Sequence, residues 1–278
     1  MKKIDFHVHI TPPEIIENWK KYAETEPYFA LLSNTPHNKF ACAEDIVAML
    51  DKSGFDSAVI FGFAFRDMGL CRLVNDYVIE SVGKFPEKLI GFISVQPKAA
   101  GVEKEIDRCH SKGLRGIGEL FPEGQGLTIE NEQETRTFSG VCTERNLPVI
   151  IHANEPVGHM YAGKTSVSLQ QIERFIENCQ GLKIVLAHWG GGLIFFESMP
   201  EIRKKLSNVY YDTAATPFLF NEGIYKTALA LGLCEKILFG TDFPLLPPSR
   251  YLAALEVLPE TDRGRILGGN AENLLNFS

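Results

Sequence analysis

The chain has 278 residues, of which 45% are hydrophobic, and this length suits either one α/β barrel or two small domains. Acidic residues outnumber basic ones by 35 to 28, which gives a formal net charge of -7, and the sequence contains no run of Lys or Arg. This charge argues against nucleic acid or an anionic membrane as a partner, so we expect a small-molecule substrate.

The N-terminal sequence MKKIDFHVHI is not expected to act as a signal peptide or membrane span, because Asp5, His7 and His9 interrupt its apolar residues. The 6 cysteines are far apart and form no C-x-x-C pair, which indicates reduced thiols rather than a disulfide framework or a zinc knuckle. These features predict a cytoplasmic protein. A homodimer is the candidate assembly.

Short apolar, β-branched runs alternate along the chain with stretches of helical periodicity. Eight such units favour a single (β/α)8 TIM-type barrel over residues 1–278, rather than an open doubly wound sheet, and no linker divides the chain. The expected strands are residues 3–10, 57–64, 89–96, 115–120, 148–154, 183–188, 208–214 and 236–242, and the expected helices include 70–84, 102–112 and 169–179.

The longest irregular segment, residues 11–43, lies between the first strand and its helix. We expect a short N-terminal cap here, with an extra helix at 13–23 packed on the barrel rim. Whether the cap also covers a pocket is left open. The segment is rich in aromatic residues, namely Trp19, Tyr22, Tyr28, Phe29 and Phe40.

The first expected strand alternates between apolar and polar residues. One face is expected to hold Ile4, Phe6, Val8 and Ile10, and the other Asp5, His7 and His9. Two imidazoles on one face of a strand can share a metal ion. By itself, however, H-x-H is also typical of a strand whose polar face is in water.

Four further apolar strands end in a residue of the metal-ligand type. They are GIGELFP with Glu119, VIIHANE with His152, IVLAHWGGG with His188 and ILFGTDFP with Asp242. Each alone has a structural explanation, such as a surface carboxylate, a hydrogen-bonded core histidine or a helix cap. In a parallel barrel, however, all strand ends converge at one mouth, so together these residues predict a site.

Buried ionisable groups are costly unless they are neutralised, and a divalent cation would compensate carboxylates and neutral imidazoles together. Nitrogen and oxygen ligands without thiolate favour zinc first, with manganese or ferrous iron as alternatives. We therefore expect a metal-dependent enzyme that uses a metal-activated water.

The order of these residues resembles that of the amidohydrolase superfamily. More narrowly, the chain is similar to the branch related to aminocarboxymuconate-semialdehyde decarboxylase, which includes hydrolases, nonoxidative decarboxylases and a hydratase. The motifs that carry this resemblance span nearly the whole chain: IDFHVHI, KGLRGIGELFP, HANEPVGHMYAGK, LAHWGGG, LFGTDFPL and ILGGNAENLLNF.

The resemblance implies that His7 and His9 bind a first metal, with Asp242 as a further ligand and proton shuttle. His152 and His188 would bind a second metal, and Glu119 would bridge the two. In one-metal relatives His152 joins the first set instead, and His188 acts as a free acid or base. The presence of Glu119 favours two ions over one.

Substrate contacts are expected near the mouth. The loop after the fifth strand contributes Glu155, His159 and Lys164, and the second strand is followed by Arg66. Lys164 and Arg66 are the candidates to bind a substrate carboxylate, unless they are ordinary exposed cations. The expected function is hydrolysis of a small amide, lactone or ester. The alternative is decarboxylation or hydration of an unsaturated carboxylic acid.

Overall fold

The computed structural model describes residues 1–35 and 39–276. Its centre is a set of parallel strands that pair in sequence order within two sheets. The first sheet holds β1 (Ile4–His9), β2 (Ser57–Phe61) and β3 (Leu89–Gly91). The second holds β4 (Ile117–Leu120), β5 (Val149–Ile151), β6 (Ile184–Leu186), β7 (Val209–Asp212) and β8 (Ile237–Leu238).

Backbone contacts join the two sheets at both seams. At one seam Ile93 forms a parallel bridge with Ile117, and its N–H donates to the carbonyl of Gly116 at 2.8 Å. At the other seam Val8 forms a parallel bridge with Phe243, and the N–H of His9 donates to Phe243 at 2.8 Å. The strands therefore form a closed ring, as the predicted barrel requires.

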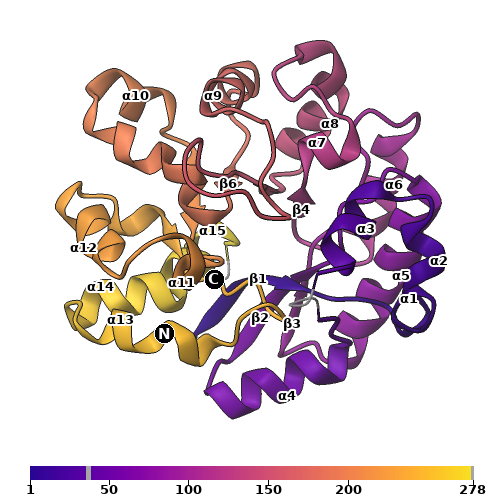
Figure 1. Ribbon diagram of the computed structural model, residues 1–278, viewed down its shortest axis with the longest axis horizontal. Coiled ribbons are helices and arrows are strands. Elements are labelled where there is room, and N and C mark those ends of the chain that lie inside the picture. The colour runs from indigo at the N-terminus through magenta and orange to yellow at the C-terminus, as the bar shows by residue number, and fades with distance from the viewer. Residues whose placement is uncertain (36–38, 277–278) are drawn as a thin grey trace.

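Helices surround this ring (Figure 1). The predicted helices at 70–84, 102–112 and 169–179 correspond to α5 (Met68–Lys84), α6 (Val102–Ser111) and α9 (Leu169–Asn178). The other main helices are α4 (Ala43–Ser53), α8 (Glu132–Glu144), α10 (Pro200–Lys205), α12 (Gly223–Ala230), α13 (Leu252–Glu256), α14 (Glu260–Gly264) and α15 (Asn270–Leu274). None of the helices in the described ranges is both long enough and apolar enough to span a membrane.

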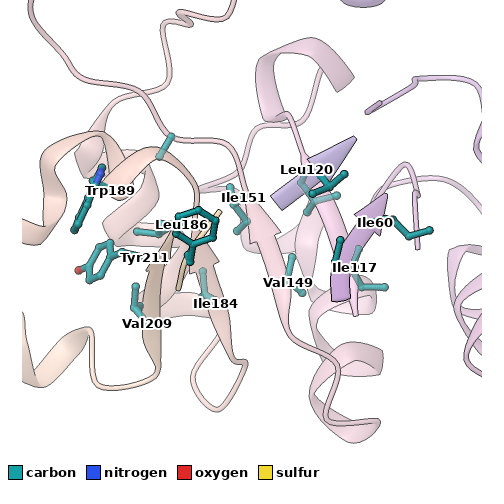
Figure 2. Packing of buried hydrophobic residues seen from close by; sticks show 14 of the residues in the cluster. Ile60, Ile117, Leu120, Val149, Ile151, Ile184, Leu186, Trp189, Val209 and Tyr211 are labelled. Atoms are coloured by element: carbon teal, nitrogen blue, oxygen red, sulfur yellow. The ribbon is translucent and has the colours of Figure 1, made fainter. Parts of the chain in front are cut away.

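The apolar side chains of the strands divide into two buried clusters. The larger joins strand residues to the helices, and Figure 2 shows Ile117, Val149, Ile151 and Ile184 within it. The smaller consists mainly of strand residues, as in a barrel interior. Each strand is buried on both faces, against the helices on one side and in the barrel interior on the other. This explains why its sequence is apolar on both faces.

The expected alternation in β1 is wrong in its first half. Ile4 and Phe6 belong to the smaller cluster, whereas Val8 and Ile10 belong to the larger one. The cause is a shift of register between Asp5 and Val8 where β1 pairs with β2. Such an irregularity breaks the strict alternation of side chains along a strand. The even-numbered apolar residues of β1 therefore point to two different faces of the sheet.

The cap consists of three short helices rather than one. The expected helix at 13–23 is divided into α1 (Pro13–Glu17) and α2 (Trp19–Ala23), and α3 (Pro27–Ser33) follows. Asn18 interrupts the first two, with φ -117 and ψ 23, and its side-chain amide donates to the Glu14 carbonyl at 3.0 Å. An asparagine side chain that bonds to the backbone competes with helical hydrogen bonding.

A sharp turn follows β6. Trp189, Gly190, Gly191 and Gly192 all have positive φ, and this left-handed stretch reverses the chain before the short helical turns that end at Ser198. A Cβ at Gly191 would lie 2.3 Å from the carbonyl oxygen of Asn154, whereas one at Gly192 would meet nothing closer than 3.6 Å. The turn therefore depends on Gly191 for close approach to the β5 loop.

We predict that Gly191→Ala lowers the free energy of unfolding by about 3 kcal/mol, because backbone atoms must move to admit the methyl group. Gly192→Ala is the matched control and should cost about 1 kcal/mol, since it adds only left-handed strain. Urea unfolding of both variants checks this. Equal losses in the two variants would contradict the assigned contact.

Candidate metal centre

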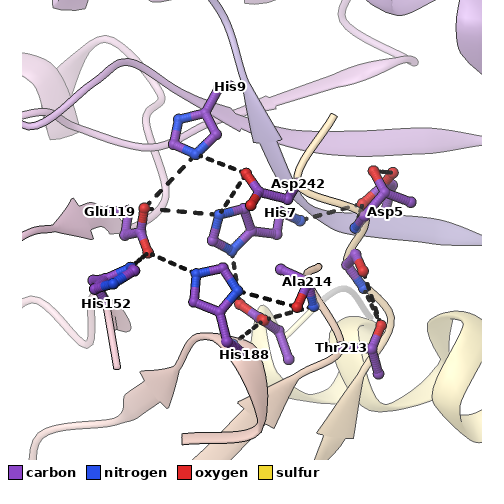
Figure 3. Close-up of polar contacts among 12 residues, drawn as sticks. Asp5, His7, His9, Glu119, His152, His188, Thr213, Ala214 and Asp242 are labelled. Atoms are coloured by element: carbon purple, nitrogen blue, oxygen red, sulfur yellow. Dashed lines mark hydrogen bonds and ion pairs between the residues drawn. The ribbon is translucent and has the colours of Figure 1, made fainter. Parts of the chain in front are cut away.

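Six ionisable side chains meet at the carboxyl ends of the strands (Figure 3). They are His7 and His9 on β1, Glu119 on β4, His152 after β5, His188 after β6 and Asp242 after β8. All have at most 15% of their side-chain surface exposed. The six residues predicted as metal ligands are thus brought together.

The first group of ligand atoms contains His7, His9 and Asp242. Asp242 Oδ1 lies 3.2 Å from His9 Nε2 and 3.8 Å from His7 Nε2. The second group contains Glu119, His152 and His188. Within each group the ligand atoms lie within 4.8 Å of one another, which is close enough to surround one cation.

Glu119 stands between the two groups. Its Oε1 lies 3.1 Å from His152 Nδ1 and 3.7 Å from His188 Nε2. Its Oε2 lies 3.7 Å from His9 Nε2 and 3.8 Å from His7 Nε2. One carboxylate therefore presents an oxygen to each group, as a bridging ligand would.

Hydrogen bonds orient three of the imidazoles. His7 Nδ1 lies 2.8 Å from Asp212 Oδ2, His188 Nδ1 lies 3.0 Å from the Ala214 carbonyl, and His152 Nε2 lies 2.8 Å from the Gly163 carbonyl. If the ring nitrogen named here carries the proton and donates it to that oxygen, the other ring nitrogen has a lone pair that points toward the six residues. Within residues 1–35 and 39–276, the buried His7 Nε2 has no hydrogen-bond partner. The donor set therefore fits divalent ions with nitrogen and oxygen ligands.

The carboxylates hold two of these histidines protonated in the metal-free protein. Burial opposes a charge on His7, but Asp212 and Glu119 outweigh it and raise its pKa to about 10. Burial likewise opposes a charge on His188, and Glu119 and Asp242 raise its pKa to about 9. At neutral pH a proton therefore occupies each position that a cation would take.

The same charges act on the carboxylates in return. Burial favours the neutral acid, yet His7 and His152 hold the pKa of Glu119 well below its usual range. Burial also opposes ionisation of Asp242, and His9 and His7 bring its pKa down to about 2. Both carboxylates are thus anionic and able to bind a cation at neutral pH.

Asp242 is held in a strained backbone conformation. Its φ is 63, which is unusual for a residue with a side chain, and its N–H donates to the His7 carbonyl at 2.9 Å. The preceding Thr241 donates from its N–H and its hydroxyl to Asp5, at 3.0 Å and 2.6 Å. Buried Asp5 thereby fixes the segment that presents Asp242.

A cavity of about 600 Å³ opens above these residues and is lined by five of the six, all except His7. The cap contributes to it through α3, with Tyr28 and Phe29, whereas Trp19 and Tyr22 lie elsewhere. The cap therefore covers the pocket in part, which settles the point left open by the sequence.

The four predicted substrate-binding residues are placed differently. His159 lines the cavity, whereas Arg66, Glu155 and Lys164 do not. Arg66 Nε donates to the Gly124 carbonyl at 2.6 Å, and Lys164 Nζ donates to Glu155 Oε1 at 3.1 Å and to loop carbonyls. Lys164 is thus engaged within the protein, and exposed Arg66 is held through its Nε.

Sequence patterns did not point to two of the contacts at the site. The Gly163 carbonyl that orients His152 is a backbone group in a loop, and no residue type marks it. The link from Asp5 to Thr241 spans most of the chain. A third supporting residue is Asp212 at the end of β7, whose carboxylate orients His7.

Known proteins share this architecture. The sequence model of the Amidohydrolase family matches residues 4–277. No curated protein sequence matches the chain. The solved structure of 5-carboxyvanillate decarboxylase from Sphingomonas paucimobilis is similar with a TM-score of 0.80 and 16% identity, covering 99% of both chains.

Two further structures are similar. Dihydroxybenzoic acid decarboxylase from Polaromonas sp., with bound manganese and the inhibitor 2-nitroresorcinol, has a TM-score of 0.73 and 19% identity, covering 99% of this chain and 97% of that one. A probable 2-pyrone-4,6-dicarboxylic acid hydrolase from Acinetobacter baumannii, with citric acid bound, has a TM-score of 0.67 and 16% identity, covering 100% of both. At these identities the likeness concerns the fold.

We predict that loading the protein with zinc at about pH 7 releases up to two protons, because His7 and His188 are protonated beforehand, with pKa values of about 10 and about 9. Affinity should therefore rise with pH until both histidines are neutral. Isothermal titration calorimetry in buffers of different ionisation enthalpy measures the number of protons that zinc binding releases. A heat that does not depend on the buffer would contradict the assigned protonation.

Proposed function

We propose that this chain, which belongs to the Amidohydrolase family, is a hydrolase that uses two divalent ions to cleave a small amide, lactone or ester. The observation that carries the proposal is the position of Glu119. Its two oxygens face separate groups of ligand atoms, 3.1 Å from His152 on one side and 3.7 Å from His9 on the other. A bridging carboxylate offsets the repulsion between two cations.

Bound divalent ions would make a hydroxide available near neutral pH and would polarise the substrate carbonyl. Asp242 faces the cavity, and His9 and His7 keep it ionised, so it can accept a proton from the attacking water. It can then deliver that proton to the leaving group. In this arrangement His188 serves as a ligand, and in a one-metal arrangement it would be free to transfer protons.

Zinc is our proposed metal because four imidazoles with two carboxylates form a borderline-soft donor set. Manganese is the alternative, since the dihydroxybenzoic acid decarboxylase of Polaromonas binds it. Metal analysis of protein purified without added ions would distinguish the two.

A second candidate function is nonoxidative decarboxylation, or hydration, of an unsaturated carboxylic acid. It is favoured by the similar folds of two decarboxylases. Against it, Lys164 is paired with Glu155, and neither Lys164 nor Arg66 lines the cavity. Assays of holoenzyme with aryl esters and lactones, run beside carbon dioxide detection with aromatic acids, separate the two. Carbon dioxide release without any hydrolysis would reject the hydrolase.

We predict that Glu119→Gln weakens binding of the second ion by roughly 100-fold, because a neutral amide bridges two cations poorly. The metal content at limiting zinc should fall from about two ions to about one. Plasma mass spectrometry after dialysis measures it. Glu235→Gln, at a side chain that is 77% exposed, is the control and should keep both ions. Unchanged stoichiometry in Glu119→Gln would reject the bridge.

We predict that Asp242→Asn keeps the fold but lowers turnover by roughly 100-fold to 10,000-fold, since the amide retains one ligating oxygen and cannot accept the proton. Steady-state rates with an ester or lactone that the wild type cleaves, together with circular dichroism, check both parts. Asp51→Asn, on the exposed surface of α4, is the matched control. A near-normal rate across neutral pH would show that Asp242 is not the proton acceptor.

A further inference from the structure

The cavity above the metal centre is larger than a minimal amide requires. Its volume of about 600 Å³ lies in the range of pockets that enclose drug-sized ligands. Five of the six residues of the centre, all except His7, belong to its lining, which also includes residues of the cap and of α11 (Thr216–Leu219). The cavity therefore has room for a substrate that carries a sizeable group next to the bond that is cleaved.

These walls are mainly apolar and come from separate parts of the fold. The side chains belong to α3, to the loops after β2, β4 and β8, and to α11. They are Phe29, Leu32, Phe63, Phe121, Phe218 and Leu245. Binding there would remove much of the apolar surface of an aryl or branched acyl group from contact with water. This burial would stabilise the complex.

Two tyrosines in the lining present their rings, because their hydroxyls are already bonded. The hydroxyl of Tyr161 donates to Glu155 Oε2 at 2.9 Å. Burial and a hydrogen bond to the Glu123 carboxylate raise the pKa of Tyr28 to about 12. Neither hydroxyl proton is therefore free to be donated to a polar substrate group.

One lysine and one histidine in the lining have exposed side chains. They are Lys39 and His159. Among the residues that the structure describes, no arginine belongs to the lining. A substrate carboxylate against the middle of the walls would lose its water shell without gaining a partner, and that loss costs several kcal/mol.

We propose that the substrate carries an uncharged, apolar aryl or branched acyl group next to the bond that is cleaved, and that any anionic group on it lies outward, near Lys39 and His159. The position of the cleaved bond over the metal ligands rests on the proposed function. The apolar character of the neighbouring group rests on the walls alone. Phe218, on α11, becomes a specificity-determining residue.

Hydroxamic acids test this, because they share a metal-binding head and differ only in the group attached to it. Binding to zinc-loaded protein is measured by calorimetry for phenylacetohydroxamic acid, succinic monohydroxamic acid and acetohydroxamic acid. The phenyl compound should bind roughly tenfold more tightly than acetohydroxamic acid, and the succinic compound no more tightly. A preference for the succinic compound, or no binding by the phenyl compound, would overturn the proposal.

Phe218→Ser extends the test to the wall itself. Phe218 is 53% exposed, so its loss should leave the fold intact and reduce the preference for the phenyl compound by roughly threefold. Phe196→Ser, at a residue that is 48% exposed and outside the lining, should leave the preference unchanged. Equal effects of the two variants would contradict the assigned wall. Preferential phenyl binding by a protein that hydrolyses nothing would reject hydrolysis while keeping the substrate class.

Discussion

The cost of burying charge governs the site. Glu119 and Asp242 are ionised beside four imidazoles in a barrel mouth where at most 15% of any of these side chains is exposed. Without counter-charges such carboxylates would cost several kcal/mol each. In the metal-free protein, protons on His7 and His188 supply the compensation. A divalent ion would take over that compensation, so metal binding and proton release are coupled.

Much of the centre was predictable because a parallel barrel maps sequence onto space in a simple way. Every strand runs from the same end of the barrel to the other end. A His, Glu or Asp that follows the apolar residues of a strand must therefore lie at the common mouth of the barrel. That rule placed His152, His188 and Asp242 without knowledge of any loop. It also placed Glu119 at this mouth, whereas its position between two ligand groups was implied only by the family resemblance. The helices at 70–84, 102–112 and 169–179 followed from periodicity, since their amphipathic faces are long enough to be unambiguous.

The rest depended on contacts that a local pattern does not encode. The register shift in β1 changes which apolar residues face the barrel interior, and it arises from pairing with β2. Arg66 and Lys164 stay predictions as substrate ligands, and their contacts with Gly124 and Glu155 come from loops that a local pattern does not place. The cap is divided at Asn18, whose side chain bonds to the Glu14 carbonyl. A cytoplasmic location, a homodimer and the one-domain division over residues 1–278 stay predictions.

The bridging role of Glu119 is tested most directly by anomalous X-ray scattering from crystals grown with excess zinc. Two peaks are expected, about 3.5–4 Å apart, with one Glu119 oxygen at each. His7, His9 and Asp242 should surround the first ion, and His152 and His188 the second. A single fully occupied ion bound by His7, His9, His152 and Asp242, with His188 unligated and facing the cavity, would contradict the two-metal centre.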